Sequence, residues 1–152
     1  MQKILLATLL SLALSAKLYS AEANEGWLTD FEAAKKAVAE KKMPILADFS
    51  GSDWCGWCIK LKKEVFSQKE FKDFAKENLV LFMADFPRKL KQDEKIKKQN
   101  KELAAKYGIK GFPTVLLVDT DGKVLARTGY KPGGAVSYIE HLKKMIADSG
   151  KK

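Results

Sequence analysis

The sequence has few of the residues that bind metals or build disulfide scaffolds. Its 152 residues include two cysteines, Cys55 and Cys58, and a single histidine, His141. Structural zinc needs four ligands, as do most iron–sulfur clusters, so we predict no metal and no cofactor and assign His141 to a surface or half-buried helix position. A disulfide between cysteines three positions apart closes almost no loop and removes little entropy from the unfolded chain. The pair is therefore predicted to serve chemistry rather than stability.

No uncharged run in the sequence is long enough to span a membrane. The longest, Ile4–Ala16, has thirteen residues, whereas a membrane-spanning helix needs about 20. It follows a positive start, Met1–Lys3, and precedes Ala21-Glu22-Ala23, which supplies the small residues that signal peptidase prefers. We therefore predict a cleaved signal peptide over residues 1–23 and a periplasmic or secreted domain over 24–152, with a retained N-terminal anchor as the alternative.

Acidic residues are too few to balance the basic ones. The chain has 28 Lys and Arg against 19 Asp and Glu, a formal charge of +9, and the densest basic stretch is Arg88–Lys101. This stretch has no interleaved aromatic residues for base stacking and no recognised nucleic-acid motif, so no nucleic acid is predicted as a partner. We interpret it as a solvated helix face. An acidic protein partner or an anionic membrane surface is the alternative, which salt dependence would test.

Hydrophobic periodicity predicts alternating helices and strands in one domain. Thr29–Glu32 and Ser67–Glu70 read as capping boxes that open helices, and Thr120-Asp121-Gly122 marks a hairpin. Strands separated by helices form parallel pairs, whereas a hairpin adds antiparallel strands. The predicted fold is α/β, a four-stranded mixed sheet with a parallel pair and an antiparallel hairpin, covered by helices on both faces. Helices are expected over about 29–42, 55–66, 67–78, 93–107 and 135–148, and strands over 44–50, 79–86, 114–119 and 123–128. In the last helix the residues expected to pack inward are Val136, Ile139, Leu142 and Ile146.

The two cysteines lie where a buried strand ends and a helix begins. Pro44–Ser50 is apolar on both sides except for Asp48, and Trp54-Cys55-Gly56-Trp57-Cys58 follows it. At a helix N-terminus, unpaired backbone N–H groups and the helix dipole favour the thiolate of Cys55. Cys58, one turn later, is close enough to form a disulfide with it. Attack on a substrate disulfide followed by release through a second thiol requires this arrangement.

These motifs resemble the thioredoxin family, from about Thr29 to Met145. The resemblance rests on Trp54–Cys58, on the Asp48 strand, and on Gly111-Phe112-Pro113-Thr114 before the hairpin. Phe66-Ser67 and Gly129-Tyr130 are similar to secreted thioredoxin-like proteins and to the C-terminal periplasmic domain of the bacterial transmembrane thiol reductant transporter. The resemblance implies a thioredoxin fold that exchanges disulfides with protein thiols.

The resemblance also implies a role for individual residues. Cys55 would be the attacking thiolate and Cys58 the resolving thiol, and Asp48 would assist proton transfer at Cys58. Burial raises the pKa of a carboxyl group, so that it can exchange a proton near neutrality. Pro113 would be a cis-proline that faces the cysteines. The residues expected to bind substrate are Trp54, Gly56, Trp57, Phe112, Pro113 and Thr114.

Three features depart from the family pattern. Asp48 precedes Cys55 by seven positions, one more than in ordinary thioredoxins, and a residue in the loop Gly51-Ser52-Asp53 would absorb the difference. Asp53 itself is interpreted as an exposed loop aspartate, with an electrostatic influence on Cys55 as the alternative. The basic partner of the buried carboxylate is missing, because apolar residues occupy 81–83. Finally, Gly56-Trp57 differs from the dipeptides of cytosolic thioredoxins and of disulfide isomerases, which leaves the redox direction open.

Two functions are compatible with the sequence. The first is a monomeric thiol–disulfide oxidoreductase of exported proteins, leaning to a reductase that a membrane-bound thiol donor supplies with electrons. The oxidising compartment argues against reduction unless such a donor exists. The alternative is a non-catalytic binding module with a stable disulfide, in which Trp54, Trp57 and Phe112 form an apolar patch.

Overall fold

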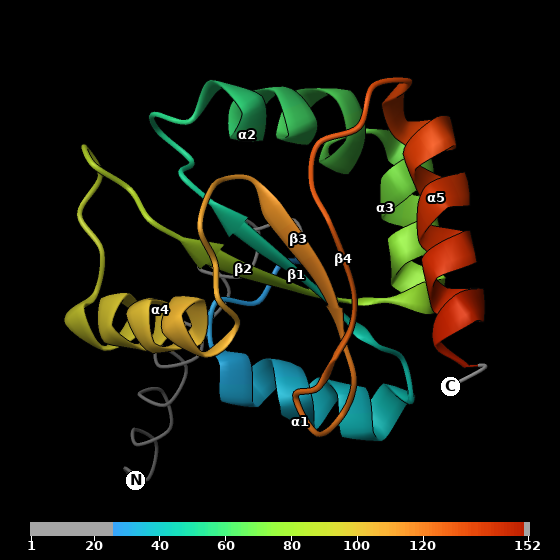
Figure 1. The fold of residues 1–152 in the computed structure, drawn as a ribbon, viewed down its shortest axis with the longest axis horizontal. Coiled ribbons are helices and arrows are strands. Elements are labelled where there is room, and N and C mark those ends of the chain that lie inside the picture. The colour runs from blue at the N-terminus through green and yellow to red at the C-terminus, as the bar shows by residue number, and fades with distance from the viewer. Residues whose placement is uncertain (1–25, 151–152) are drawn as a thin grey trace, which may run out of the picture.

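A computed structural model describes residues 26–150 and shows one sheet between two layers of helices (Figure 1). The thioredoxin fold predicted from the sequence is confirmed. The predicted leader, residues 1–23, lies outside the described residues. The helices are α1 (Phe31–Lys41), α2 (Gly56–Leu61), the π-helical turn η1 (Lys62–Phe66), α3 (Lys69–Asn78), α4 (Glu94–Lys106) and α5 (Gly134–Ser149), and the strands are β1 (Ile45–Ser50), β2 (Val80–Asp85), β3 (Thr114–Val118) and β4 (Val124–Thr128).

The four strands form a mixed sheet in the order β2-β1-β3-β4. β1 pairs in parallel with β2, with Ile45 opposite Val80, and antiparallel with β3, with Ile45 opposite Val118. β3 and β4 form the antiparallel hairpin. Every residue of β1 is buried, because β1 has a strand on each side and helices on both faces. The predicted parallel pair and hairpin are therefore both present.

The two faces of the sheet pack against different helices. Side chains alternate along β1, so Leu46 joins the core under α2, η1, α3 and α5, whereas Ala47 and Phe49 join the core over α1 and α4. Figure 1 shows α1 and α4 below the sheet, α2 above it, and α3 and α5 to its right. By the same alternation the Asp48 side chain lies on the face of the sheet that carries Leu46. The helix α2, which begins after Cys55 and contains Cys58, covers this face.

The helix caps differ from the predicted capping boxes. The N-cap of α1 is Asp30 rather than Thr29, and its carboxylate accepts the N–H of Ala33 at 3.0 Å. The second box is absent, because the Ser67 N–H donates to the carbonyl of Lys62 at 2.8 Å and completes η1. As a result α3 begins one residue later than a Ser67 cap would place it, after Gln68, which makes no side-chain capping bond.

The buried face of α5 also differs from the predicted one. Val136 is 65% exposed, while Tyr138 is buried and its hydroxyl donates to the carbonyl of Gly129 at 2.9 Å. Ile139 and Leu142 are buried, as expected, and Ile146 is partly buried against the same core. The ring of Tyr138 fills the core while its hydroxyl forms a hydrogen bond just after β4. The buried face of α5 therefore includes Tyr138 instead of Val136.

Candidate active site

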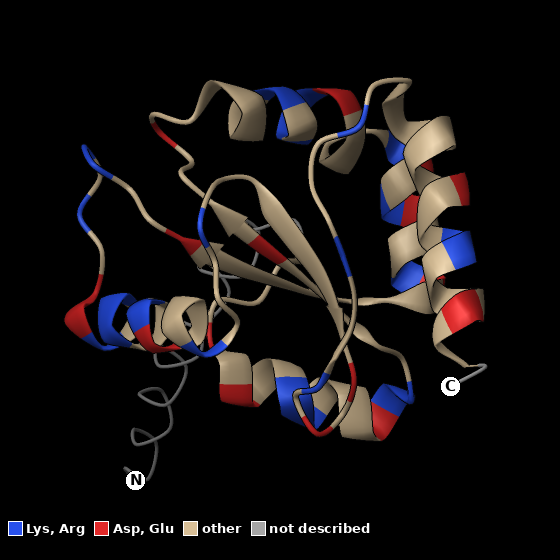
Figure 2. Ribbon diagram, in the orientation of Figure 1, with Lys and Arg blue, Asp and Glu red and all other residues tan. Residues whose placement is uncertain are grey.

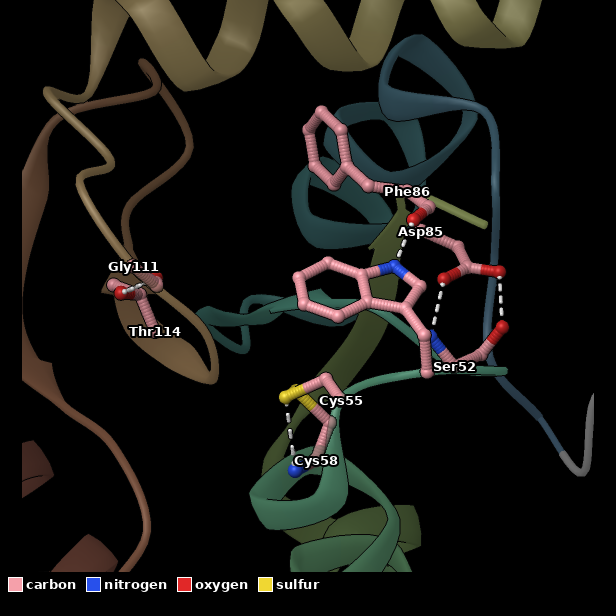
Figure 3. Close-up of a disulfide and its surroundings, with 8 residues drawn as sticks. Ser52, Cys55, Cys58, Asp85, Phe86, Gly111 and Thr114 are labelled. Atoms are coloured by element: carbon pink, nitrogen blue, oxygen red, sulfur yellow. Dashed lines mark hydrogen bonds between the residues drawn. A yellow bond between two sulfur atoms is a disulfide. The ribbon is translucent and has the colours of Figure 1, made fainter. Parts of the chain in front are cut away.

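Cys55 and Cys58 form a disulfide at the start of α2 (Figure 3). Their Cα atoms are 5.2 Å apart. Cys55 is the N-cap of the helix, and its Sγ accepts the N–H of Cys58 at 3.2 Å. Both cysteines are largely buried, with 7% of Cys55 and 4% of Cys58 exposed. The Cys58 N–H, which has no partner within the helix, therefore points at the sulfur of Cys55, the predicted nucleophile.

The loop before Cys55 is closed onto the end of β2. Ser52 donates its backbone N–H to one Asp85 carboxylate oxygen at 2.9 Å and its hydroxyl to the other at 2.6 Å (Figure 3). The Cys55 N–H donates to the carbonyl of Gly51 at 2.8 Å. The additional residue between Asp48 and Cys55 is thus accommodated in a turn over residues 51–55, which the hydrogen bonds from Ser52 to Asp85 fix in place. Sequence reasoning missed Asp85, because its contact with Ser52 spans 33 positions.

Trp54 is a fixed wall beside the disulfide. Its indole N–H donates to the carbonyl of Phe86 at 2.7 Å, and its ring meets the ring of Phe112 edge-on at 5.9 Å. The guanidinium carbon of Arg88 lies 3.6 Å from the centre of the same ring. Cation–π stacking and the hydrogen bond orient the indole, and it is only partly exposed.

The close approach of Trp54 to Gly51 predicts that Gly51→Ala will disturb this loop. A Cβ atom at position 51 would lie 2.5 Å from the indole ring, which its bonds to Phe86 and Arg88 hold in place. We expect the free energy of unfolding in urea to fall by about 1–3 kcal/mol, the usual cost of overpacking, with a change in tryptophan fluorescence. Gly56→Ala is the matched control, since an added Cβ there meets nothing within 4 Å. Equal stability of the two variants would contradict the expectation.

Asp53 holds the segment after β2 instead of standing free in its loop. Its carboxylate accepts the backbone N–H groups of Arg88, Lys89 and Leu90 at 2.9, 2.7 and 2.8 Å. These donors, Arg88 first, hold the pKa of Asp53 below its usual value. Asp53 is thus a partly exposed loop residue that also binds residues 88–90, and the local sequence carries no signal for partners about 35 positions away.

The other side of the disulfide carries a second aromatic pair. Trp57 is 58% exposed, and its ring centre lies 5.0 Å from that of Tyr130. The Lys60 ammonium lies over both rings, at 5.1 and 5.3 Å, and the Tyr130 hydroxyl donates to Glu64 at 2.7 Å. Trp57 is therefore largely exposed to solvent, but Tyr130 and Lys60 contact its ring. Lys60 and Glu64 were not predicted as part of the site.

The segment before β3 lies next to the redox loop through the contact of Phe112 with Trp54. The Phe112–Pro113 peptide bond is cis, the isomer that the resemblance implies. Thr114 donates its hydroxyl to the carbonyl of Gly111 at 2.7 Å, which closes the turn around this bond (Figure 3). Phe112 also packs against Phe86, with ring centres 5.1 Å apart. The structure thus brings the predicted substrate-binding residues to both sides of one disulfide.

Asp48 is a buried carboxylate on the cysteine side of the sheet. Only 4% of it is exposed, and its pKa is raised from 3.8 to about 7, first by burial and then by the Asp85 carboxylate. Within residues 26–150 its Oδ1 atom has no hydrogen-bond partner.

Met83 lies opposite Asp48 on β2, so the missing basic partner is confirmed at that position. Cys58 and Leu61 share the buried stripe of α2 that faces the core to which Leu46 belongs. A pKa of about 7 allows the Asp48 carboxyl group to take up or release a proton near neutrality.

The remaining metal-ligating side chains do not gather at the site. Residues 26–150 hold no group of three or more His, Cys, Asp and Glu side chains placed to bind a metal ion. His141 is partly buried in α5, with Nε2 2.9 Å from the Thr128 hydroxyl. Its pKa is lowered by burial, then by Lys131 and Lys144. The half-buried helix position expected for His141 is thus what the structure shows.

A family model described as a thioredoxin-like domain matches residues 31–145. The chain belongs to this family. It is 40% identical over 126 residues to the disulfide bond reductase DsbH of Chlamydia pneumoniae, covering 83% of this chain and 75% of that protein. A solved structure of the DsbH oxidoreductase superposes with a TM-score of 0.77 at 36% identity, covering 90% of this chain and 94% of the other.

The fold is shared more widely than the sequence. The C-terminal domain of Neisseria meningitidis DsbD in its oxidised form matches with a TM-score of 0.53 at 23% identity, covering 75% of this chain and 90% of that one. That likeness shows the fold alone. The disulfide at the start of α2, in a fold and family shared with DsbH, identifies this thioredoxin-like chain as a thiol–disulfide oxidoreductase.

Proposed function

We propose that this oxidoreductase reduces disulfides in exported proteins, with Cys55 as nucleophile and Cys58 as resolving thiol. The observation that carries the proposal is the placement of Cys55 at the N-cap of α2, with the Cys58 N–H directed at its sulfur. A thiolate at that position gains a backbone hydrogen bond and the favourable end of the helix dipole. The direction of the reaction rests on the likeness to DsbH, which is named a disulfide bond reductase.

The reaction consists of two thiol–disulfide exchanges. The Cys55 thiolate attacks one sulfur of the substrate disulfide, that bond breaks, and the other substrate sulfur leaves as a thiolate. The Cys58 thiolate then attacks the Cys55 sulfur of the mixed disulfide. The second substrate sulfur leaves, the Cys55–Cys58 disulfide forms, and two electrons have passed to the substrate.

Asp48 is proposed as the group that accepts the proton of Cys58 before the second exchange. A carboxylate with a pKa of about 7 is close to the best value for a proton acceptor at neutral pH. Within residues 26–150 the Oδ1 atom of Asp48 has no hydrogen-bond partner, which leaves room for a proton on this side chain. Asp48 acts through Cys58 and has no direct contact with substrate in this scheme.

Substrate is proposed to bind along the surface between the two aromatic pairs. Gly56 leaves open space over the disulfide, since an added Cβ atom meets nothing within 4 Å. Trp54 and Trp57 flank this opening, while the backbone of Phe112 offers pairing groups to an extended segment of substrate. Pro113 and Thr114 would shape the floor of the same groove. Residues on both sides of the scissile disulfide would thereby be held in register for attack.

The protein is proposed to work as a monomer in the periplasm or outside the cell, after removal of residues 1–23. Among residues 26–150 no helix is long and apolar enough to cross a membrane. An exported reductase must be reduced again in an oxidising compartment, so a membrane-bound thiol donor is proposed as its electron source. Protein thiols and disulfides are its other partners.

The equilibrium potential of the Cys55–Cys58 pair tests this function first. We expect a value towards about −270 mV, the reducing end of the family, from titration with dithiothreitol or glutathione redox buffers. Tryptophan fluorescence and alkylation of Cys55 would report the reduced fraction. A value towards about −120 mV would instead indicate a disulfide donor and overturn the reductase assignment. A pair that does not cycle at all would leave the binding module as the function.

A further inference from the structure

A basic recess lies next to the active site, between the end of β2 and α4. It encloses about 500 Å³. Its cationic side chains are Arg88, Lys91, Lys97 and Lys101, and Glu94 is the one carboxylate among the residues that line it. Figure 2 shows the blue of Lys and Arg on the segment before α4 and along α4 itself. The lining also includes apolar residues, Phe86, Pro87 and Leu90, of which Leu90 is 63% exposed.

The basic recess is fixed to the active-site loop by several bonds. Asp53 accepts the backbone N–H groups of Arg88, Lys89 and Leu90. Trp54, the residue before Cys55, bonds to the carbonyl of Phe86. From the other end, Asn100 of α4 is fully buried and donates to the carbonyl of Asp85 at 2.9 Å. The recess is therefore a built part of the surface around the disulfide.

The charges of the recess are largely uncompensated. Lys97 pairs with Glu94 at 3.4 Å. Within the part of the chain that the structure describes, Arg88, Lys91 and Lys101 form no ion pair. Arg88 instead lies over the face of Trp54, so one edge of the positive surface is in contact with the residue that precedes the nucleophile. An anion bound here would meet cations already held close together, without having to displace an internal partner.

We propose that the basic recess binds an acidic segment of the protein substrate that flanks its reactive disulfide. This deepens the proposed function and rests on it. A polypeptide joined to Cys55 passes beside Trp54 and Phe112, and the next surface along the Trp54 side is the recess, through Arg88 and Phe86. Carboxylates of such a segment would pair with Lys91 and Lys101, while its apolar atoms would cover Leu90. This replaces the interpretation of Arg88–Lys101 as only a solvated helix face.

The observations favour a polypeptide over the other anions. Single-stranded nucleic acid binds through aromatic faces on which bases stack, but the face of Trp54 nearest the recess is covered by Arg88. A membrane surface attracts lysines without requiring a concave site. Here the cations line a hollow with apolar walls, beside the position to which exchange brings a protein.

Two peptides with the same disulfide-containing core test the proposal, one flanked by glutamates and the other by glutamines. The reduced protein is expected to reduce the acidic peptide about three- to tenfold faster in kcat/KM, since a few partly exposed ion pairs of this kind add up to that range. The advantage should disappear when ionic strength rises from about 0.01 to about 1 M. In Lys91→Ala/Lys101→Ala the ratio of the two rates should approach one.

A second double variant, Lys36→Ala/Lys41→Ala, is the matched control. It removes the same charge from exposed positions of α1 that do not line the recess, and should keep the wild-type ratio. Equal rates for both peptides with the wild type would overturn the acidic-segment proposal and leave the oxidoreductase function intact. Binding by wild type but not by Lys91→Ala/Lys101→Ala to phosphatidylglycerol vesicles, together with equal peptide rates, would assign the recess to a membrane.

A separate binding measurement distinguishes failure of this proposal from failure of the proposed function. The acidic peptide with both cysteines replaced by serine is titrated into the oxidised protein, and tryptophan fluorescence reports occupancy beside Trp54. Binding that Lys91→Ala/Lys101→Ala weakens supports the recess even if neither peptide is reduced, in which case the reductase function falls alone. No binding combined with normal reduction of both peptides overturns the recess alone.

Discussion

The oxidised protein is expected to lose about 4 kcal/mol of stability between pH 4 and pH 8 through Asp48 alone. A pKa that rises from 3.8 to about 7 on folding corresponds to that free energy. Between these pH values the folded state holds the proton and the unfolded state does not, so unfolding becomes easier as pH rises. The contribution is fully present below about pH 4 and is lost as pH rises through about 7.

Asp48→Asn removes this ionisation and isolates its effect. Urea unfolding at a series of pH values should give a difference between wild type and variant that grows by about 4 kcal/mol from pH 4 to 8. Asp121→Asn, at an exposed turn position, is the control and should show a constant difference. A pH-independent difference for Asp48→Asn would mean that the carboxyl group is not protonated in the folded protein near neutrality.

The same variant separates a role in proton transfer from a structural one. If Asp48 accepts the Cys58 proton, Asp48→Asn should slow release of substrate from Cys55 by at least about tenfold at neutral pH and flatten the pH profile of that step. Attack by Cys55 should be much less affected. An unchanged profile for release would limit Asp48 to its effect on stability.

Replacing Cys58 with serine is expected to stop turnover and trap the substrate on Cys55. The first exchange needs only Cys55, whereas release needs the second thiol, so the mixed disulfide should accumulate. Turnover should fall more than about 100-fold, because a serine hydroxyl neither attacks the mixed disulfide nor forms a disulfide. Non-reducing electrophoresis and mass spectrometry of the adduct would check this outcome.

Cys55→Ser distinguishes the two sulfurs. It should lose turnover to the same extent but form no adduct, because Cys58 lies deeper and its thiol is not at the N-cap of α2. The reduced wild type, followed by circular dichroism, controls for any effect of losing the disulfide on the fold. Adducts on Cys58 in place of Cys55 would reverse the proposed roles.

The two sides of the disulfide offer different chemistry to a substrate. On one side Trp54 is locked by Phe86, Phe112 and Arg88 and leads to the basic recess. On the other side Trp57 is exposed and rests on Tyr130 and Lys60. A substrate bound as we propose would therefore meet the basic recess on one flank and, on the other, two aromatic rings with the Lys60 ammonium over them.

The sequence by itself determined the fold and the reactive pair. Alternating apolar strands and amphipathic helices specify the sheet, because burial of each apolar face leaves few arrangements of these elements. The position of Cys55 at a strand-to-helix junction is equally local. Asp48 was recognisable because one carboxylate in an otherwise apolar strand must be buried. These features depend on neighbours within a few positions, which a sequence displays directly.

Only the tertiary structure decided what surrounds the cysteines. The Ser52–Asp85 bonds, the capping of residues 88–90 by Asp53 and the stacking of Arg88 on Trp54 join segments more than 30 positions apart. The basic stretch 88–101 forms the wall of a recess because Asp53 binds its first residues and Asn100 of α4 binds the end of β2. Side-chain partners of this kind depend on how two elements meet in space, and hydrophobic periodicity carries no information about that meeting.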